Sequence, residues 1–419
     1  MNLKDNKYAK YYLVQEMMGT VPTVAKFDPA CSKFVADSVR KTGKIFFTGE
    51  GSSRLLPAKN SRRVSMTWGL ATEVQTDGSH QAAQYDLSKF SVLIDSNSGR
   101  TKEALMLAKK LQAEGHKETF ALSANPDTPI RQACADGHVL GCGWEEAVAA
   151  TKSVVEQALF CESIFWNLAG KDMKAALKGL PEKLEQAMTL PVPAEVVEWV
   201  KGAHTIYFAG YNDGVAEELT LKTNEITRRK SDFLEGTYAV HGIEEVMQEG
   251  DIVFLVDPIE SEYDKFLSVF KGAGVHVVAI STKQTPFEKT IVVPEAGEMQ
   301  AYVYLCAGWN ILVEVGISDG INHDKPERAR KVGNEMKSAG PAYAVSDKPF
   351  DRPLVQYVVR RVLPGAVSVE RLLFLSLAQP SFRDRGRQPE RLHRGQPRLP
   401  GSERHPPGAA GHGRRRRLS

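Results

Sequence analysis

A lysine, a glutamate and a histidine follow one another in residues 221–242, LKTNEITRRKSDFLEGTYAVHG, at spacings that could support proton transfer. Lys222 and Glu225 are three residues apart, so they share one face if this segment is helical. His241 follows in a part that we expect to be a loop. A carboxylate can move a proton between two carbons, and an imidazole titrates near neutral pH. The alternative interpretation is a surface ion pair of Glu218 with Lys222, next to an ordinary loop histidine.

Two polar loops follow apolar runs in the N-terminal half of the chain. The first, GEGSS, has Ser52 and Ser53 in a glycine-rich turn. The second, DSNSGRT, contributes the polar side chains of Ser96, Asn97, Ser98 and Thr101. Backbone N–H groups and hydroxyls at such turns can bind a phosphate monoester. Neither loop has the lysine of a P-loop, and Arg54 stands where a dinucleotide fingerprint needs its third glycine. Plain turns with serine caps are the alternative.

These candidate residues lie between short apolar runs that predict buried strands. The runs of the first half are 44–49, 90–96, 118–124 and 137–143. Those of the second half are 204–211, 250–258, 274–282 and 290–296. Continuous apolar runs are typical of parallel strands that are buried on both faces, and helix-like segments separate them. The pattern therefore predicts an α/β protein with two tandem units of flavodoxin-like size.

We expect the chain to divide into four regions. They are an N-terminal helical segment (1–40), a unit with the polar loops (41–180), a unit with Glu225 and His241 (200–340), and a tail (349–419). The stretch 171–200 connects the two units. The tail has 15 Arg and no Lys, whereas the 348 residues before it have 10 Arg and 29 Lys. With its dense proline, the tail indicates translation in a shifted reading frame or a basic disordered arm, and we expect no fold beyond about residue 380.

Composition excludes several classes of function. The net charge of +3 comes from the tail, so the rest of the chain has no basic excess with which to bind nucleic acid. The five cysteines are scattered, without a CxxC pair or metal spacing, as expected for free thiols in a reducing compartment. The N-terminus lacks the apolar centre of a signal peptide, and no run approaches a membrane span. We expect a cytoplasmic protein with no membrane contact, metal or cofactor.

Ordered motifs make the chain resemble SIS domains, the phosphosugar-binding fold of sugar isomerases. GEGSS, SNSGRT and GWEEAVAATKS look like the successive motifs of that family, over roughly residues 40–340. The third motif is matched at Gly143, Glu145, Val148, Ala149, Thr151 and Lys152. The nearest pattern is the isomerase half of glucosamine-6-phosphate synthases, with related deaminases and deglycases. The resemblance implies two tandem SIS domains, each a three-layer unit around a parallel sheet.

The resemblance also implies roles for single residues. In the family, a glutamate moves a proton between C1 and C2 of the open-chain sugar, and a histidine from the neighbouring subunit opens the ring. These roles fall on Glu225, with Lys222 beside it, and on His241. A further family lysine, in a D-x-P-x-x-x-x-K context, falls on Lys331. The substrate-binding positions are Ser52, Ser53, Ser96, Asn97, Ser98, Thr101 and Val148.

Two departures from the family pattern affect what we expect. Ile243 follows the His-Gly pair where the family often has proline, which leaves the substrate open. The corresponding loops of the second half, AGYNDG and VDPIES, lack the hydroxyls, so we expect that half to supply catalytic groups and not a second phosphate site.

The expected function is a sugar-phosphate aldose–ketose isomerase or deaminase acting on a hexosamine 6-phosphate, in a homodimer or larger assembly with His241 donated in trans. About forty residues precede the first predicted strand, too few for a glutaminase domain. A fructosamine-6-phosphate deglycase is one alternative, because it needs the same glutamate and histidine. A non-catalytic sensor of sugar phosphates is the other.

Overall fold

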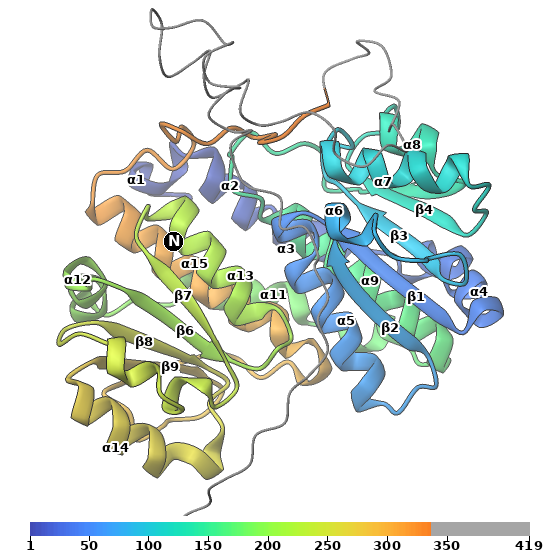
Figure 1. The fold of residues 1–419 in the computed structure, drawn as a ribbon. Coiled ribbons are helices and arrows are strands. Elements are labelled where there is room, and N and C mark those ends of the chain that lie inside the picture. Colours follow the sequence, from blue (N-terminus) through green and yellow to red (C-terminus); the bar gives the residue numbers. More distant parts are fainter. Residues whose placement is uncertain (337–419) are drawn as a thin grey trace, which may run out of the picture. The chain divides into compact units, whose positions relative to one another are not determined.

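Two five-stranded parallel sheets form the framework of this α/β chain (Figure 1). The computed structural model describes residues 1–336, and the predictions for the tail 349–419 fall outside them. The strand orders are β2-β1-β3-β4-β5 and β10-β9-β8-β6-β7. In each sheet the first strand has the second on one side and the third on the other. Both halves therefore have the same topology, as the tandem SIS resemblance implied.

The first sheet is the middle layer of three. Its strands are β1 Lys44–Gly49, β2 Glu73–Gly78, β3 Ser91–Asp95, β4 Thr119–Ser123 and β5 Asp136–Val139. Ile45 and Phe47 pack on one side, against helices α4 Lys33–Thr42, α5 Leu55–Thr67 and α9 Lys152–Ala169. Phe46 packs on the other side, against α6 Ser79–Ala82, α7 Lys102–Ala113 and α8 Pro129–Ala133. Side chains that alternate between two apolar layers explain the continuous apolar runs.

The second sheet repeats this arrangement. Its strands are β6 Ile206–Gly210, β7 Ser231–Glu235, β8 Ile252–Val256, β9 His276–Ser281 and β10 Lys289–Val292. Phe208 packs on the side of helices α12 Ala194–Gly202, α13 Val215–Ile226 and α15 Gln300–Ser318. Tyr207 packs on the side of α14 Tyr263–Ala273 and the 3₁₀ helix η3 Tyr238–Val240. Two further 3₁₀ turns on this side are η4 Ile243–Val246 and η5 Glu260–Glu262.

The eight predicted strands are present, and the sequence analysis missed β2 and β7. Both are edge strands, and each has one buried side chain, Val74 and Leu234. An edge strand that is mostly exposed needs no apolar run, so the pattern that reveals central strands does not apply to it. Strand β5 is also shorter than predicted and ends at Val139 instead of residue 143.

Helices from three parts of the chain share one core with the second sheet. The N-terminal helices are α1 Asn6–Ala9, α2 Tyr12–Met18, α3 Thr20–Lys26 and the 3₁₀ helix η1 Pro29–Ser32. Between the sheets the chain forms α10 Met173–Leu177 and α11 Leu180–Thr189 before α12. Leu13 and Val24 belong to the same buried cluster as Leu184 and Trp309. The N-terminal helices are therefore part of the core around α11 and α15.

One helix has the length and composition of a membrane span, contrary to the expectation that no run approaches it. Residues Gly297–Ser318, comprising the 3₁₀ turn η6 Gly297–Met299 and α15, have a mean hydropathy of 1.3. The packing around the helix buries 83% of the apolar window inside the described residues. Its neighbours include α11 and α13. The apolar run thus serves as a central core helix in this structure.

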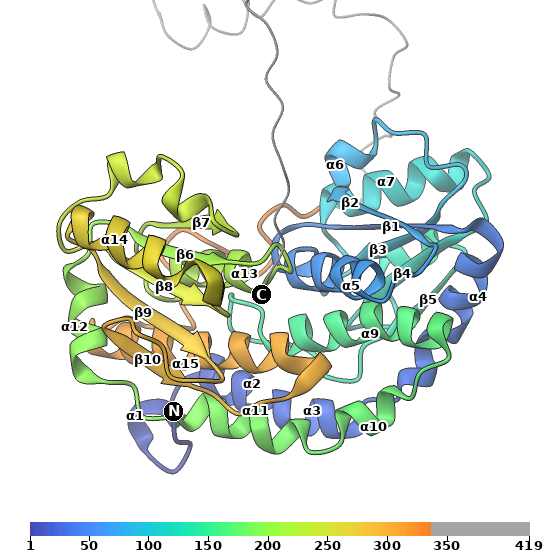
Figure 2. The same cartoon turned by 90° about the horizontal axis from the view of Figure 1, so that it is seen from below.

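The two halves meet along helices α5 and α13, which lie between the sheets (Figure 2). Gly214, with φ of +91°, immediately precedes α13, and a Cβ there would overlap the backbone of Leu55. Further along, Arg63 of α5 lies 4.0 Å from the carboxylate of Asp213. A glycine at this point permits both the left-handed backbone and the close approach of the two helices.

Candidate active site

Helix α13 places Lys222 and Glu225 against the glycine-rich turn of the first half. Lys222 Nζ lies 2.6 Å from Glu225 Oε2 and donates a hydrogen bond to Ser52 Oγ at 2.9 Å. Lys222 is 0% exposed, whereas Glu225 is 28% exposed. The buried ammonium thus joins two segments that are 170 residues apart. The partly exposed carboxylate of Glu225 therefore remains accessible to a ligand that binds next to Lys222 and Ser52.

A second carboxylate, that of Glu218, completes the surroundings of the lysine. Its Oε1 lies 3.3 Å from Lys222 Nζ, and both side chains are 0% exposed, so the interpretation as a surface pair is wrong. Burial by itself lowers the pKa of Lys222, but Glu225 and Glu218 outweigh that effect and raise it. Burial raises the pKa of Glu218 to about 7, against the effect of the ammonium. Lys222 therefore stays charged, and Glu218 can take a proton near neutral pH.

The polar loop after β3 is held by its own hydroxyls. Ser96 Oγ lies 2.9 Å from Thr101 Oγ1, and Ser98 Oγ accepts a hydrogen bond from the Arg100 N–H at 3.2 Å. Thr101 is the N-cap residue of α7, but its side chain makes no capping hydrogen bond. The side-chain oxygen of Asn97 is buried without a hydrogen-bond partner among residues 1–336. These groups do not act as simple helix caps, so they can turn towards an anion.

The topology brings the two predicted polar loops to the same edge of the first sheet. Strands β1 and β3 are parallel neighbours, so the turns after their carboxyl ends are adjacent. The order of the strands reverses between them, which is where ligands bind in open α/β sheets. Ser52 is buried there, and Ser53 Oγ accepts a hydrogen bond from Gln157 at 3.4 Å. The two serine loops are therefore neighbours, and the first of them contacts the buried Lys222 through Ser52.

The glutamate of the third motif has a structural role at the start of α9. Glu145 is fully buried, and its carboxylate accepts hydrogen bonds from the N–H groups of Thr151 and Ser153 at 2.8 and 3.3 Å. It also accepts from their hydroxyls, at 3.1 and 2.6 Å. A carboxylate at a helix N-terminus satisfies N–H groups that lack a partner within the helix. The arrangement fixes the loop that carries the half-buried Val148.

Lys331 reaches the same loop from the end of the described chain. Its Nζ donates a hydrogen bond to the Ala147 carbonyl at 2.5 Å and lies 3.6 Å from the carboxylate of Glu145. Burial lowers the pKa of Lys331, against the opposing effect of Glu145. The structure therefore places Lys331 on the loop residue before Val148, without a hydrogen bond or ion pair to Lys222, Glu218 or Glu225 among residues 1–336.

His241 is separate from this cluster within one chain. It follows the short helix η3 and is exposed. Among residues 1–336 its side chain makes no hydrogen bond and no ion pair, and thus none with Lys222 or Glu225. Eight of the predicted positions lie on the two serine loops of the first sheet and on α13, whereas the histidine lies in the loop before β8.

The equivalent edge of the second sheet carries carboxylates. Asp213 follows β6, Asp257 follows β8, and the Tyr304 hydroxyl donates to Asp257 at 2.9 Å. They line a cavity of about 610 Å³ together with Arg63. Carboxylates repel a phosphate, and the absence of a second phosphate site from this half stays a prediction. Among residues 1–336 no cluster of three His, Cys, Asp or Glu is placed to hold a metal ion.

Comparison with solved structures identifies the fold. No protein-family model and no curated protein sequence matches the chain. The structure superimposes on the C-terminal domain of glucosamine-fructose-6-phosphate aminotransferase from Francisella tularensis with a TM-score of 0.65 and 16% identity, over 77% of this chain and 100% of that one. The structural neighbours are phosphosugar isomerases of the SIS type, so the chain has their fold.

Two further neighbours show what this fold is used for elsewhere. Glucosamine-6-phosphate deaminase from Thermotoga maritima matches with a TM-score of 0.57 and 18% identity, over 78% of this chain and 99% of its own. Tagatose-6-phosphate ketose/aldose isomerase from Escherichia coli matches with a TM-score of 0.60 and 14% identity, over 77% of this chain and 98% of its own. At these identities the likeness is one of fold, and the substrates belong to those proteins.

Proposed function

We propose that this protein is a phosphosugar aldose–ketose isomerase or amino-sugar-phosphate deaminase that acts on a hexosamine 6-phosphate. The proposal depends above all on the buried contacts of Lys222 with Ser52 and Glu225, at 2.9 and 2.6 Å. They place a partly open carboxylate next to the edge of the sheet where the two serine loops meet. A base and a phosphate site at one position are what an open-chain sugar phosphate requires.

The proposed chemistry uses the chain's own side chains. Glu225 takes the proton from C2 of the 2-amino aldose and returns it to C1, while a proton passes from the amine nitrogen to the C1 oxygen, which leaves a ketose imine. Water adds to the imine and ammonia leaves, giving the ketose 6-phosphate. Lys222, kept charged by its two carboxylates, holds Glu225 in place. The hydroxyls of Ser96, Ser98 and Thr101 bind the phosphate, and Lys331 with Val148 positions the sugar.

We also propose that His241 acts in the site of a neighbouring subunit. The histidine is exposed, and so are Tyr238 and Val246 in the same connection. Large apolar side chains that gather at the surface favour an interface with another copy. We place this homodimer in the cytoplasm, where scattered free thiols stay reduced.

Product analysis tests the proposed activity. Purified protein is incubated with glucosamine 6-phosphate, a fructosamine 6-phosphate and hexose 6-phosphates without an amine, and ammonia, free amino acid and ketose phosphate are measured. Ammonia together with ketose phosphate is the expected result. Release of free amino acid would favour the deglycase instead. Saturable binding without turnover of any substrate would favour a non-catalytic sensor of sugar phosphates.

The substitution Glu225→Gln tests the base directly. The amide keeps the shape of the side chain but cannot accept the C2 proton, so we expect turnover to fall on the order of 10²–10⁴-fold with binding nearly unchanged. The measurement is exchange of solvent deuterium into C1 or C2 of the substrate. Glu217→Gln is the matched control, because Glu217 lies on the same helix with 24% exposure and pairs with Lys59 outside the site. Normal exchange in Glu225→Gln would exclude this carboxylate as the base.

Mixed dimers test the donated histidine. Glu225→Gln and His241→Ala subunits are each expected to be impaired alone. A mixed dimer regains part of the activity, because one of its two sites then has both groups. Activity that stays at the sum of the parents after mixing would place His241 in its own subunit's site or outside catalysis.

A further inference from the structure

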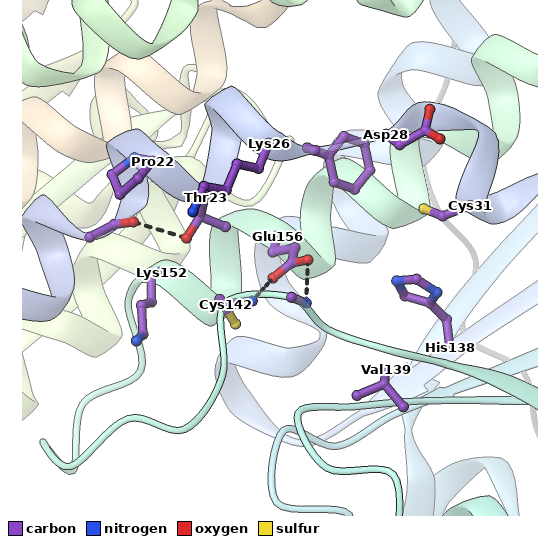
Figure 3. Close-up of a pocket in the computed structure, with 13 residues that line it drawn as sticks. Pro22, Thr23, Lys26, Asp28, Cys31, His138, Val139, Cys142, Lys152 and Glu156 are labelled. Carbon is purple, nitrogen blue, oxygen red and sulfur yellow. Dashed lines mark hydrogen bonds between the residues drawn. The ribbon is translucent and has the colours of Figure 1, made fainter.

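A cavity of about 510 Å³ lies on the first half of the chain (Figure 3). Its walls come from the region of α3 and η1, from the loop after β5 and from the start of α9. None of its lining residues belongs to the candidate active site. The volume is that of a pocket for a small molecule.

Two lysines and two carboxylates line this cavity. Lys26 and Lys152 line it, and neither has an ion-pair partner among residues 1–336. The buried carboxylate of Glu156 accepts the N–H groups of Gly141 and Cys142 at 2.7 and 2.6 Å, which satisfies its oxygens as acceptors but leaves its negative charge (Figure 3). The remaining carboxylate, that of Asp28, lies 3.1 Å from the ammonium of Lys174. Two ammonium groups without partners in one cavity favour an anionic ligand.

The opposite end of the cavity has polar side chains and the carboxylate of Asp28, which is paired with Lys174. Figure 3 shows His138 and Cys31 there, whereas the two lysines lie towards Thr23. Burial lowers the pKa of His138, whose ring stacks on Phe160 with 5.0 Å between centroids. Burial also raises the pKa of Cys31 to about 12. A neutral imidazole, a neutral thiol and the apolar Phe27 and Val139 suit the uncharged body of a ligand.

The floor of the cavity continues into the loop of the candidate active site. The N–H groups of Gly141 and Cys142 are held by Glu156, and a few residues later Glu16 accepts the N–H of Ala147 at 3.2 Å. The carbonyl of Ala147 accepts the hydrogen bond from Lys331. A ligand against the first part of this loop would therefore act on the position of Val148 and Lys331.

We propose that this cavity is a separate binding site for a small organic anion, a carboxylate or phosphate monoester with an apolar or ring-shaped body. The anionic group lies on Lys26 and Lys152, and the body lies against Phe27, Val139 and His138. Binding there tunes the affinity of the active site through the loop after β5. Whether the cavity binds such an anion does not depend on the proposed reaction, so the site itself can be tested by binding alone.

Calorimetric titration with phenyl phosphate tests the site. The full chain carries Ser96→Ala, Ser98→Ala and Thr101→Ala, so that the proposed phosphate loop does not compete. We expect saturable binding of phenyl phosphate, weaker binding of inorganic phosphate, and a loss of affinity on the order of tenfold or more in Lys26→Ala/Lys152→Ala. Lys33→Ala/Lys41→Ala on α4 removes the same charge outside the cavity and should bind as before.

Three outcomes would overturn the proposal. The first is no saturable binding of phenyl phosphate, and the second is an equal loss of affinity in the two double lysine variants. The third is inorganic phosphate binding as tightly as phenyl phosphate, because the apolar wall would then have no role in binding.

Thiol labelling gives an independent readout at the cavity itself. In the same protein, phenyl phosphate should slow modification of Cys31 and Cys142 by methyl methanethiosulfonate, as followed by peptide mass spectrometry. Cys134 is the matched control, because burial raises its pKa to about 12 as well and it lies outside the cavity. Equal effects of the probe on all three thiols would contradict binding in this cavity.

Discussion

Among single residues, Lys222 connects the two halves of the proposed site. Its ammonium is fully buried between Glu218 and Glu225 and donates to Ser52. Burying a charge is costly unless it is paired and hydrogen-bonded, and this lysine is both. Such a group is held in one orientation by its partners. It therefore keeps the carboxylate of Glu225 at a fixed place relative to the serine loops.

Replacing Ser96, Ser98 or Thr101 by alanine should mainly raise KM. The phosphate is held alike in the ground state and in the transition state, so losing a contact weakens binding without slowing the chemical step. Each lost charge-assisted hydrogen bond should cost about 1.5–3 kcal/mol, or roughly ten- to a hundredfold in KM. Steady-state kinetics with phosphorylated substrate measure the effect. An unchanged KM in all three variants would remove the phosphate assignment.

Glu218 should make stability depend on pH. Its pKa of about 7 in the folded protein lies above the usual 4.5, so its contribution is fully present below pH 4.5 and is lost as the pH rises through 7. At 1.36 kcal/mol per pKa unit the loss is on the order of 3 kcal/mol. Glu218→Gln should remove it and flatten the free energy of unfolding between pH 5 and 8. Urea denaturation across that range is the measurement, and parallel curves for both proteins would contradict the assignment.

At the scale of elements, the packing of α13 on α5 determines whether Lys222 reaches Ser52. Contact between the helices depends on Gly214, whose backbone lies against Leu55 and Leu56. A second element, the loop between β5 and α9, is held in turn by Glu156, Glu16 and Glu145. Buried carboxylates that accept backbone N–H groups replace secondary structure in that loop.

Gly214→Ala should disturb both stability and the site. The new methyl group would overlap the backbone of α5, and the left-handed φ adds strain. We expect a loss of about 2–4 kcal/mol in the free energy of unfolding and lower activity. Gly250→Ala is the matched control, because Gly250 has φ of +84° but open space around it, so only about 1 kcal/mol of strain should appear. Equal losses in the two variants would mean that the close helix contact has no energetic role.

At the scale of the whole molecule, two halves of the same topology carry different chemistry at the same place. The first sheet has serines and threonine at the edge where its strand order reverses, and the second has Asp213 and Asp257. The helix contacts differ in the same way, since Lys222 meets Ser52 in one half and Arg63 faces Asp213 in the other. The duplicated fold thus provides one proposed phosphate site, with its proposed base on the other half.

Truncation after Lys348 should leave the protein folded and active. Residues 1–336 already contain both sheets and every residue proposed for the site. The change to arginine without lysine beyond that point indicates a stretch unrelated to the rest of the chain. Thermal unfolding and turnover of the shortened chain should match those of the full chain. Loss of cooperative unfolding on truncation would show that the tail contributes to the fold.

The sequence by itself determined the class of fold and the positions of the polar loops. Six of the eight predicted strands are central and have continuous apolar runs, and the edge strands β5 and β10 were found from apolar runs that extend beyond them. The edge strands β2 and β7 have one buried side chain each and no such run. The contact of Lys222 with Glu225 was predictable because a spacing of three residues places side chains together on any helix. Both predictions depend only on the spacing of residues within a single strand or helix.

Only the tertiary structure decided which of these residues are buried together. The spacing of Glu218, Lys222 and Glu225 is equally suited to an exposed helix face, and the neighbours from the other half make the lysine inaccessible. The contacts of Ser52 with Lys222 and of Ala147 with Lys331 span 170 and 184 residues. Such contacts depend on how whole helices and sheets pack, and no local pattern of residues records that packing.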